Sequence, residues 1–267
     1  MPTKTPTQSD FPPHLTVSIT SPNTTTTTTR PPPNILLLLH GIGDTSATFS
    51  TFGRALNLPE TTVLTLQAPT RLPFDIPGFH WGDDISFDSR TGALDMDAGF
   101  ARATRTIVDE VIRGVLVQKC GYKLREIMIL GFGQGGMVGL VCARELGVQP
   151  RVQDVGDSGA NDGGGIGGDM ALSGVISIGA PYPISGSVVG EKNRTPVLLV
   201  AGRDSEVVSD GAVSRTKGVF DFVEVTRYAR RGDGMPKARE EMLPVMRFLA
   251  RRLRSWQGVP EGSVEIS

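Results

Sequence analysis

The sequence is short of several features, and each shortage excludes a class of protein. Only two cysteines occur among 267 residues, Cys120 and Cys142, and both lie in apolar segments, so we expect buried free thiols and no disulfide framework. No run of about 18 apolar residues is present, which predicts no integral membrane segment. The formal net charge is −1, so the chain has no strong field to attract nucleic acid or an anionic membrane surface.

The remaining composition is that of an ordinary globular protein. Hydrophobic residues make up 39% and charged residues 21% of the chain, and the length suits one sizeable α/β domain or at most two small ones. The N-terminus lacks the charged-then-apolar pattern of a secretory signal. A mitochondrial presequence stays open, because residues 1–33 are rich in Ser and Thr and poor in acids, but cytoplasmic is the expected localisation.

Strand patterns and helix patterns alternate along the chain. The continuous apolar run at 35–39 is typical of a strand buried on both faces of a parallel sheet. Alternation of this kind predicts an α/β fold with a single doubly wound, mostly parallel sheet. The expected strands are 14–20 (at the sheet edge), 35–39, 62–66, 127–130, 172–178, 195–204 and 222–226, and the expected helices are 46–56, 98–119, 135–146, 207–219 and 240–256.

Low-complexity segments set the expected domain boundaries. We expect one domain over 14–256, containing a low-complexity loop at 24–33 and a flexible Gly/Asp insertion at 148–170. Residues 1–13 are predicted to be a disordered tail and 257–267 a C-terminal tail. The insertion is a weak match to a phosphate-binding loop, because no P-loop lysine or dinucleotide spacing accompanies its glycines. The long stretch 67–97 has no clear periodicity, and ordered loops of that length usually carry or cover a site.

One stretch has the form of a nucleophile elbow. Ile127–Gly136 reads as a strand, a tight glycine turn and the start of a helix, and the elbow pattern for that context is G-x-S-x-G. Here the serine position holds Gly133. An elbow residue has a strained backbone that glycine adopts readily, so Gly133 relaxes the turn, gives up the nucleophile and opens space for a ligand.

Further motifs match one family in order and at similar spacing from about residue 35 to 254. They are Leu39–Thr45, Gln67–Arg71, Trp81–Asp83, Gly131–Gly136, Ala201–Asp204 and Glu240–Met242. In this set the sequence resembles the phospholipase/carboxylesterase group of α/β hydrolases that includes the acyl-protein thioesterases. The resemblance implies acyl-transfer chemistry by a serine, a base that takes its proton, an acid that orients the base, and backbone donors for the oxyanion.

The resemblance also assigns positions in this sequence to those roles. Asp204 holds the position of the acid, although alone it would be read as a strand-end turn residue. The oxyanion donors would be the backbone N–H groups of Ile42 and Gln134. The histidine position falls near Met235, to within about two residues, because no histidine follows Asp204. Three further residues belong to the expected binding region, namely His40 in the oxyanion loop and Trp81 and Asp83 in the acyl-site segment.

His80 is the remaining histidine of the expected covering loop. It could face the pocket as a base or ligand-binding group, and packing within the loop is an equally good interpretation. With Asp83 and Asp84 it forms only weak evidence for a metal site, because no second ligand group is identified. We therefore expect no metal and no cofactor.

Three functions are compatible with this pattern. The first is a pseudoenzyme, a catalytically degenerate hydrolase that binds a small acyl or ester-like ligand or a protein partner. The second is an active carboxylic-ester or thioester hydrolase in which His80 activates water. The third is a scaffolding protein without a ligand pocket. The oligomeric state is left open by the sequence.

Overall fold

A computed structural model of the chain describes residues 2–23, 30–87, 92, 94–147 and 170–257. Residues 24–29 of the expected low-complexity loop, 148–169 of the expected insertion and 258–267 of the expected tail lie outside the described residues. In the described part, none of the helices combines the length and hydrophobicity that a membrane span needs.

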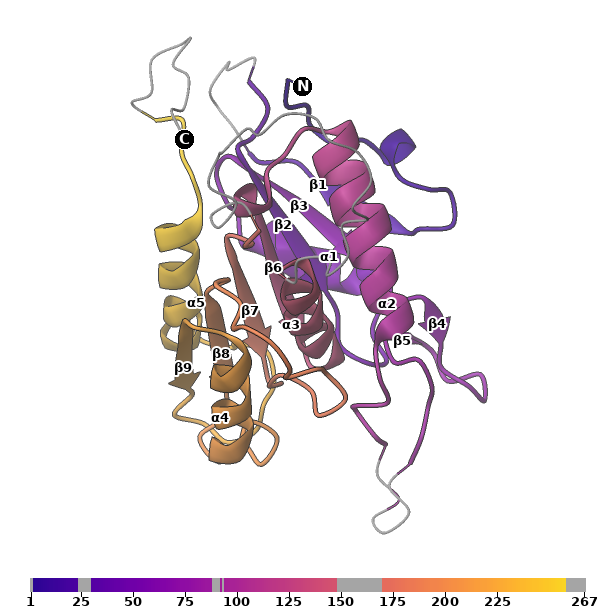
Figure 1. The fold of residues 1–267 in the computed structure, drawn as a ribbon, viewed down its shortest axis with the longest axis vertical. Helices are drawn as coiled ribbons and strands as arrows, with labels where there is room; N and C mark the ends of the chain where they lie inside the picture. Colours follow the sequence, from indigo (N-terminus) through magenta and orange to yellow (C-terminus); the bar gives the residue numbers. More distant parts are fainter. Residues whose placement is uncertain (1, 24–29, 88–91, 93, 148–169, 258–267) are drawn as a thin grey trace, which may run out of the picture.

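The described chain alternates strands and helices in the expected order (Figure 1). Its elements are η1 (Gln8–Asp10), β1 (Val17–Thr20), β2 (Asn34–Leu39), α1 (Ser46–Ala55), β3 (Thr61–Leu66), β4 (Thr70–Arg71), β5 (Phe79–His80), α2 (Ala101–Arg105), η2 (Thr106–Lys119), η3 (Leu124–Glu126), β6 (Ile127–Phe132), α3 (Gln134–Leu146), β7 (Gly174–Ile178), β8 (Val197–Ala201), α4 (Asp210–Val219), β9 (Val223–Arg227) and α5 (Arg239–Arg252).

Seven strands form one sheet in the order β1-β3-β2-β6-β7-β8-β9. β1 pairs antiparallel with β3 at the edge, and every other pairing in this sheet is parallel. The predicted doubly wound, mostly parallel α/β fold is therefore confirmed, including the edge position of the first strand. β4 and β5 form a separate two-stranded hairpin inside the expected covering loop.

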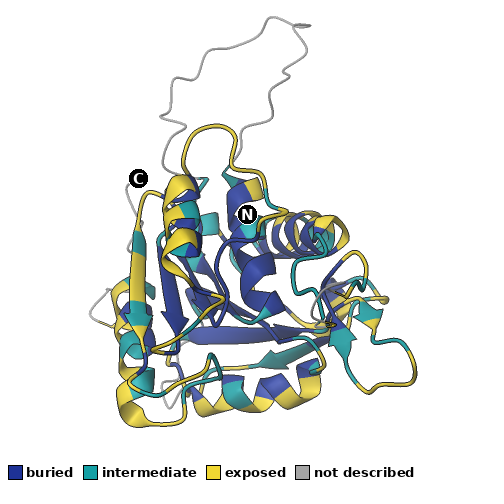
Figure 2. Ribbon diagram, turned by 90° about the horizontal axis from the view of Figure 1, so that it is seen from below, coloured by how far each residue is buried: buried dark blue, intermediate teal, exposed yellow. Residues whose placement is uncertain are grey.

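The central strands β2, β3, β6, β7 and β8 are buried on both faces, and this explains their apolar runs, whereas the edge strand β9 is largely exposed (Figure 2). Along β2, Ile35, Leu37 and Leu39 join the core beneath η2 and α3. The intervening Leu36 and Leu38 join a second core with α1 and α5. Because successive side chains of a strand point to opposite faces, one run of leucine supplies both cores.

The helix ends follow local signals. α1 begins after Thr45, whose side chain accepts a hydrogen bond from the Thr48 N–H, as expected of an N-cap. α3 ends at Gly147, the predicted C-cap. The predicted helix at 98–119 is observed as α2 followed by η2, which has π-helical bonding and ends with a bond from the Cys120 N–H to the Val115 carbonyl.

The N-terminal segment differs from its prediction. Residues 2–13 were expected to be disordered, but the Lys4 N–H donates to the Cys120 carbonyl at 2.9 Å, and Phe11 is 5% exposed within the main core. The ion pair with Lys4 lowers the pKa of the Asp10 carboxyl to about 2. Composition alone could not reveal these contacts, because a single buried aromatic and a few polar bonds anchor an otherwise polar stretch.

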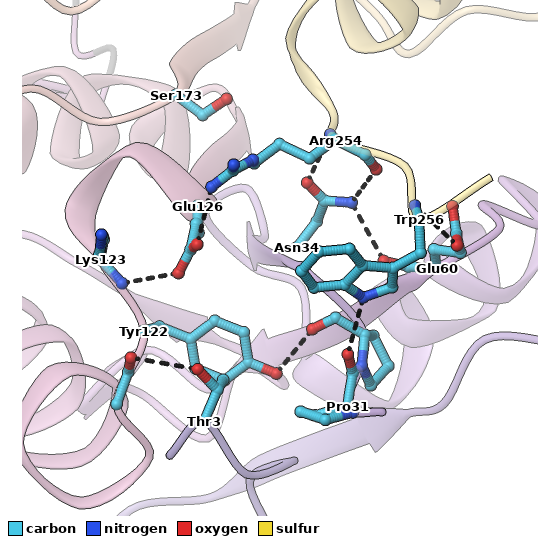
Figure 3. Close-up of polar contacts among 12 residues, drawn as sticks. Thr3, Pro31, Asn34, Glu60, Tyr122, Lys123, Glu126, Ser173, Arg254 and Trp256 are labelled. Atoms are coloured by element: carbon cyan, nitrogen blue, oxygen red, sulfur yellow. Dashed lines mark hydrogen bonds and ion pairs between the residues drawn. The ribbon is translucent and has the colours of Figure 1, made fainter. Parts of the chain in front are cut away.

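A polar network ties the segment after α5 to the amino ends of the central strands (Figure 3). The Asn34 side chain bonds the backbone of Arg254 in both directions, at 2.8 Å each way. The Glu60 carboxylate accepts from the Trp256 N–H, and the Trp256 indole donates to the Pro31 carbonyl. This network lies at the end of the sheet away from the candidate site, which is built on the carboxyl ends of the strands.

Candidate functional site

The loops after β2, β6, β7, β8 and β9 meet at the carboxyl edge of the sheet, where α/β proteins usually bind ligands. The Gly133 N–H donates to the Ile178 carbonyl at 2.9 Å. The next strand-end residue, Gly179, lies against the backbone of Asp233. Asp233 in turn bonds the loop that carries Asp204. The structure thus brings Gly133, Asp204 and the Asp233–Met235 loop, which the sequence analysis assigned to the site, to one edge of the sheet.

Gly133 has the backbone of an elbow residue. It is the N-cap of α3, with φ 53° and ψ −123°, between the last residue of β6 and the first residue of the helix. Side-chain-bearing residues adopt a positive φ of this kind only at a cost in free energy. The strand–turn–helix geometry expected of this stretch is therefore present.

The elbow glycines fall into two groups. At Gly131 and Gly135 an added Cβ would lie 2.3 Å and 2.2 Å from backbone atoms, and at Gly136 it would lie 2.3 Å from the Ser177 hydroxyl. No side chain fits at these three positions. At Gly133, by contrast, the nearest atom outside its chain neighbours would be the Met96 methyl at 3.9 Å. Close packing therefore requires three of the glycines, whereas position 133 has room for a side chain.

The two expected oxyanion donors lie in turns that other contacts hold in place. Gln134 is the first residue of α3, so its N–H has no partner within the helix. Ile42 lies in the turn after β2, next to Gly43 with φ 79°. The Gly43 N–H donates to the Phe79 carbonyl at 2.9 Å, and the Phe79 N–H donates to the Asp44 carbonyl at 3.2 Å. The β4–β5 hairpin thus fixes the turn that carries Ile42.

The Gln134 side chain connects the elbow to the covering loop. Its Oε1 accepts from the Trp81 N–H at 3.1 Å, and its Nε2 donates to the Met96 carbonyl at 3.3 Å. The side chain is 1% exposed. Sequence reasoning assigned Gln134 a backbone role only, and nothing in the pattern pointed to Met96.

His40 is fully buried and is fixed in one neutral tautomer. The Ala68 N–H and the Gln67 side-chain amide both lie about 3 Å from its Nε2, which must therefore accept, while Nδ1 donates to the Gly41 carbonyl at 2.7 Å. Burial lowers the pKa of His40, so the ring stays neutral. Both ring nitrogens are used in holding strand ends together, which leaves no basic nitrogen for catalysis.

His80 is 2% exposed, and its Nδ1 has no hydrogen-bond partner among the described residues. Burial lowers its pKa, the positive charge of Arg102 lowers it further, and Asp84 opposes both effects. Its imidazole is not among the groups within 4 Å of the position that a Cβ would take at Gly133. The ring is a buried, neutral group in the hairpin.

The other two expected binding residues, Trp81 and Asp83, make internal hydrogen bonds. The Trp81 indole N–H donates to the His40 carbonyl at 2.7 Å, and its ring is 2% exposed. The Asp83 carboxylate accepts from the N–H groups of Ala101 and Arg102 at 2.7 and 2.8 Å, which caps the first turn of α2. Both residues thus tie the covering loop to the body of the domain.

The acid position is exposed and weakly held. The Asp204 carboxylate is 47% exposed, lies 3.4 Å from the Arg231 guanidinium and accepts from the Gly232 N–H at 3.3 Å. Asp233 makes the stronger contacts, because its carboxylate accepts from the Gly202 N–H at 2.8 Å and from the Ser205 hydroxyl at 2.7 Å. Sequence reasoning missed Asp233, although it lies within the two-residue range given for the histidine position.

Arg230 occupies the middle of the loop in which the histidine was expected. Its guanidinium donates to the carbonyls of Gly234 and Met235 at 2.9 and 2.7 Å and to the Glu241 carboxylate at 2.7 Å. The Met235 side chain packs against the core on the α1 and α5 face. Arg230 therefore holds the loop through its hydrogen bonds. Met235, at the expected histidine position, packs its side chain against the hydrophobic core.

Two further features concern the surroundings of the site. In the part of the chain that the structure describes, no group of three or more His, Cys, Asp and Glu side chains is placed to hold a metal ion. A groove of about 490 Å³ lies between α2, η2 and α3, and its lining includes Phe100, Arg105 and Glu145 but not Gly133. The groove is thus separate from the elbow.

Comparisons with known proteins agree with this geometry. Residues 22–149 match the family model described as phospholipase/carboxylesterase. A protein named as a hydrolase from Schizosaccharomyces pombe is 27% identical over 221 residues, which cover 81% of this chain and 82% of the relative. A second named hydrolase, from Mycosarcoma maydis, is 40% identical over 106 residues, covering 39% of this chain and 38% of the relative.

Solved structures show the same fold. Esterase PE8 superposes with a TM-score of 0.63 at 16% identity, over 90% of this chain and 99% of that chain. Acyl-protein thioesterase 2 of Zea mays superposes with a TM-score of 0.58 at 18% identity, over 90% and 99%. The strand order and the superpositions thus show an α/β-hydrolase fold, and residues 22–149 are similar to the phospholipase/carboxylesterase family.

Proposed function

We propose that this protein is a catalytically degenerate α/β hydrolase, a pseudoenzyme that binds a small acyl or ester-like ligand at the elbow without hydrolysing it by a serine mechanism. The observation that carries the proposal is Gly133, which keeps the elbow backbone, lacks a nucleophile and has room beside it. The absence of a general base supports the pseudoenzyme proposal, because none of the three histidines of the chain lies beside Gly133.

The three histidines can be followed one by one. His14 pairs with Glu110 at 3.0 Å, His40 uses both ring nitrogens in hydrogen bonds, and His80 is buried in the hairpin. A serine hydrolase needs an imidazole within hydrogen-bond reach of the nucleophile. No imidazole atom lies within 4 Å of the position that a Cβ would take at residue 133.

A serine-directed fluorophosphonate probe tests the loss of chemistry. We expect no labelling of the natural chain. The Gly133→Ser, Met235→His double variant should be labelled weakly, through those molecules in which the introduced imidazole turns out of the packed position of Met235 toward the elbow. The single variant Gly133→Ser is the matched control and should stay almost unlabelled, because it lacks the base. Stoichiometric labelling of the natural chain would overturn the proposal.

Ligand binding needs a separate experiment. Octanoate serves as the probe, and NMR follows the amide signals of Gln134, Ile42 and Trp256. We expect the first two amides to shift on titration and the Trp256 amide, at the other end of the strands, to stay unchanged. Failure of octanoate to shift Gln134 and Ile42 would favour the third function, a scaffolding role without a ligand pocket.

Active hydrolysis with water activated by His80 is the second function to be weighed. The unpartnered Nδ1 of His80 is the one observation in its favour. Its lowered pKa is against it, because burial and Arg102 make the ring a weak base. The hydrolysis of 4-nitrophenyl octanoate by the natural chain and by His80→Ala should proceed at equal rates, and loss of that rate in the variant would restore the active-enzyme interpretation.

A further inference from the structure

Residues 95–97 pass beside the elbow and meet it at Met96. The Met96 methyl lies 3.9 Å from the position of a Cβ at Gly133, and the Met96 carbonyl accepts from the Gln134 side chain at 3.3 Å. Met96 also packs against the main core. A flexible thioether therefore lies within van der Waals contact of the side-chain position at 133.

The same segment is fastened on both sides. The Asp97 carboxylate accepts from the N–H groups of Ile184 and Ser185 and from the Ser185 hydroxyl. On the other side, the Asp95 N–H donates to the Ser86 carbonyl at 2.8 Å, and the Ser86 hydroxyl donates to the Asp95 carboxylate at 3.1 Å. The Asp95–Asp97 segment thus forms a strap from residue 86 to residues 184–185.

The Asp97 end is the side that can open at low cost. Its hydrogen bonds go to an exposed loop, in which Ile184 is 77% exposed. Exposed bonds of this kind exchange with water and open locally far more easily than buried ones. Methionine, with three rotatable bonds and a polarisable sulfur, adapts to occupants of different shape.

We propose that the Asp95–Asp97 segment is a strap that closes the elbow, and that Met96 determines what can approach position 133. With the Asp97 contacts made, the Met96 methyl occupies the approach to the elbow. Release of Asp97 from the 184–185 loop lets the strap move and admits a ligand. The inference rests on the proposed function for the identity of the ligand, an acyl chain, but the strap can be tested without any ligand.

The chain offers a clean chemical test. Cys120 and Cys142 are both fully buried, and burial raises the pKa of each thiol, so neither competes for an alkylating reagent. A Gly133→Cys variant therefore has one accessible thiol, at the elbow. Its labelling by N-ethylmaleimide should be slow with the strap intact and at least about 10-fold faster with Met96→Ala or Asp97→Ala added. The matched control, Met246→Ala, makes the same change on the opposite face of the sheet and should leave the rate unchanged.

Two outcomes would overturn the strap: fast labelling of Gly133→Cys that Met96→Ala does not change, or equal acceleration by Met96→Ala and Met246→Ala. If Gly133→Cys does not fold, hydrogen exchange in the natural backbone takes its place. Asp97→Ala should then raise the exchange rates of the Ser185 amide and of the Gly133 amide together, and an unchanged Gly133 amide would refute the coupling.

The proposed function fails separately. Octanoate binding that is absent in the natural chain and in Met96→Ala, together with a labelling rate that does respond to Met96→Ala, would leave the strap standing and refute the acyl-binding proposal. Octanoate binding that is unaffected by Met96→Ala would support the proposed function and count against Met96 as the residue that controls access.

Discussion

The two halves of the candidate site are built in different ways. The elbow half, at the ends of β2 and β6, is closely packed, with three glycines that no side chain could replace and a fully buried His40. The acid half, after β8 and β9, is held by polar side chains at the surface, with Asp204 47% exposed and Arg231 79% exposed. The elbow half is part of the buried core, whereas the acid half lies at the protein surface.

The difference separates groups that also serve folding from groups that do not. Backbone donors and glycine turns also serve the packing of α3 against the sheet, so their removal would cost stability. The side chains of a triad have no such second role, and the strained elbow residue even opposes folding by about 1–3 kcal/mol. Under the proposed function, the elbow half is kept because it also serves folding, whereas the catalytic side chains are free to change.

The largest effect is expected within the elbow half, from Gly135→Ala. The added methyl would lie 2.2 Å from the Leu39 carbonyl oxygen. Because backbone atoms of a central strand have no room to move away, we expect the free energy of unfolding to fall by more than about 3 kcal/mol, or the variant to fail to fold. Gly133→Ala has room and should cost only about 1–3 kcal/mol through its positive φ. Urea unfolding midpoints of the two variants measure the difference, and equal losses would contradict the division of the glycines into two groups.

His40 should matter nearly as much. Replacement by alanine leaves the buried N–H of Ala68 and the Gln67 amide without their acceptor and opens a cavity, so we expect a loss of about 2–4 kcal/mol. His14→Ala, on the surface, is the control and should change stability by less than about 0.5 kcal/mol. The same unfolding measurement applies, and a His40 variant as stable as the control would mean that the network is dispensable.

The pH dependence of stability should report on the buried His40 of the elbow half. The folded pKa of His40 lies below its ordinary value of 6.5 because the ring is buried, so the unfolded chain binds the proton first as the pH falls. The natural chain should therefore lose stability below about pH 6.5, and His40→Ala should lose part of that slope. His80 has its pKa lowered in the same direction and contributes to the remainder.

A smaller effect is expected in the acid half, from Arg230→Ala. Arg230 is 27% exposed and holds the 231–235 loop through carbonyl bonds and the Glu241 carboxylate, so its loss should cost about 1–3 kcal/mol. Arg231→Ala removes one exposed 3.4 Å contact and should cost less than about 0.5 kcal/mol. Thermal unfolding of both variants provides the measurement. A destabilising Arg231→Ala would show that the acid half is more tightly built than its exposure indicates.

Much of the fold could be predicted from the sequence. The Leu-rich run of β2 required a strand buried on both faces, and Thr45 and Gly147 marked the helix ends that the structure has. The elbow was recognisable because strand, glycine turn and helix follow one another within ten residues. Local patterns of this kind are set by backbone geometry and need no knowledge of distant contacts.

The contacts around the elbow could not be predicted in this way. Met96 lies 37 residues before Gly133, with no periodic pattern around it, and its position depends on the Gln134 and Asp97 bonds. The place of Asp83 in the binding region stays a prediction. Its carboxylate caps α2, and the sequence did not indicate this role because the two segments are about 18 residues apart without a local capping pattern. The anchoring of residues 2–13 escaped prediction for the same reason.

The sequence by itself determined that the chain lacks a serine at the elbow and a histidine after Asp204, because these are absences that no folding can reverse. It also determined the alternation of strands and helices, which hydrophobic periodicity specifies locally. Only the tertiary structure decided that Gly133 has room beside it, that His40 and His80 are buried, and that Met96 lies against the elbow. These facts depend on contacts between segments that are far apart in the chain. The identity of a side chain alone does not specify its partners in such contacts.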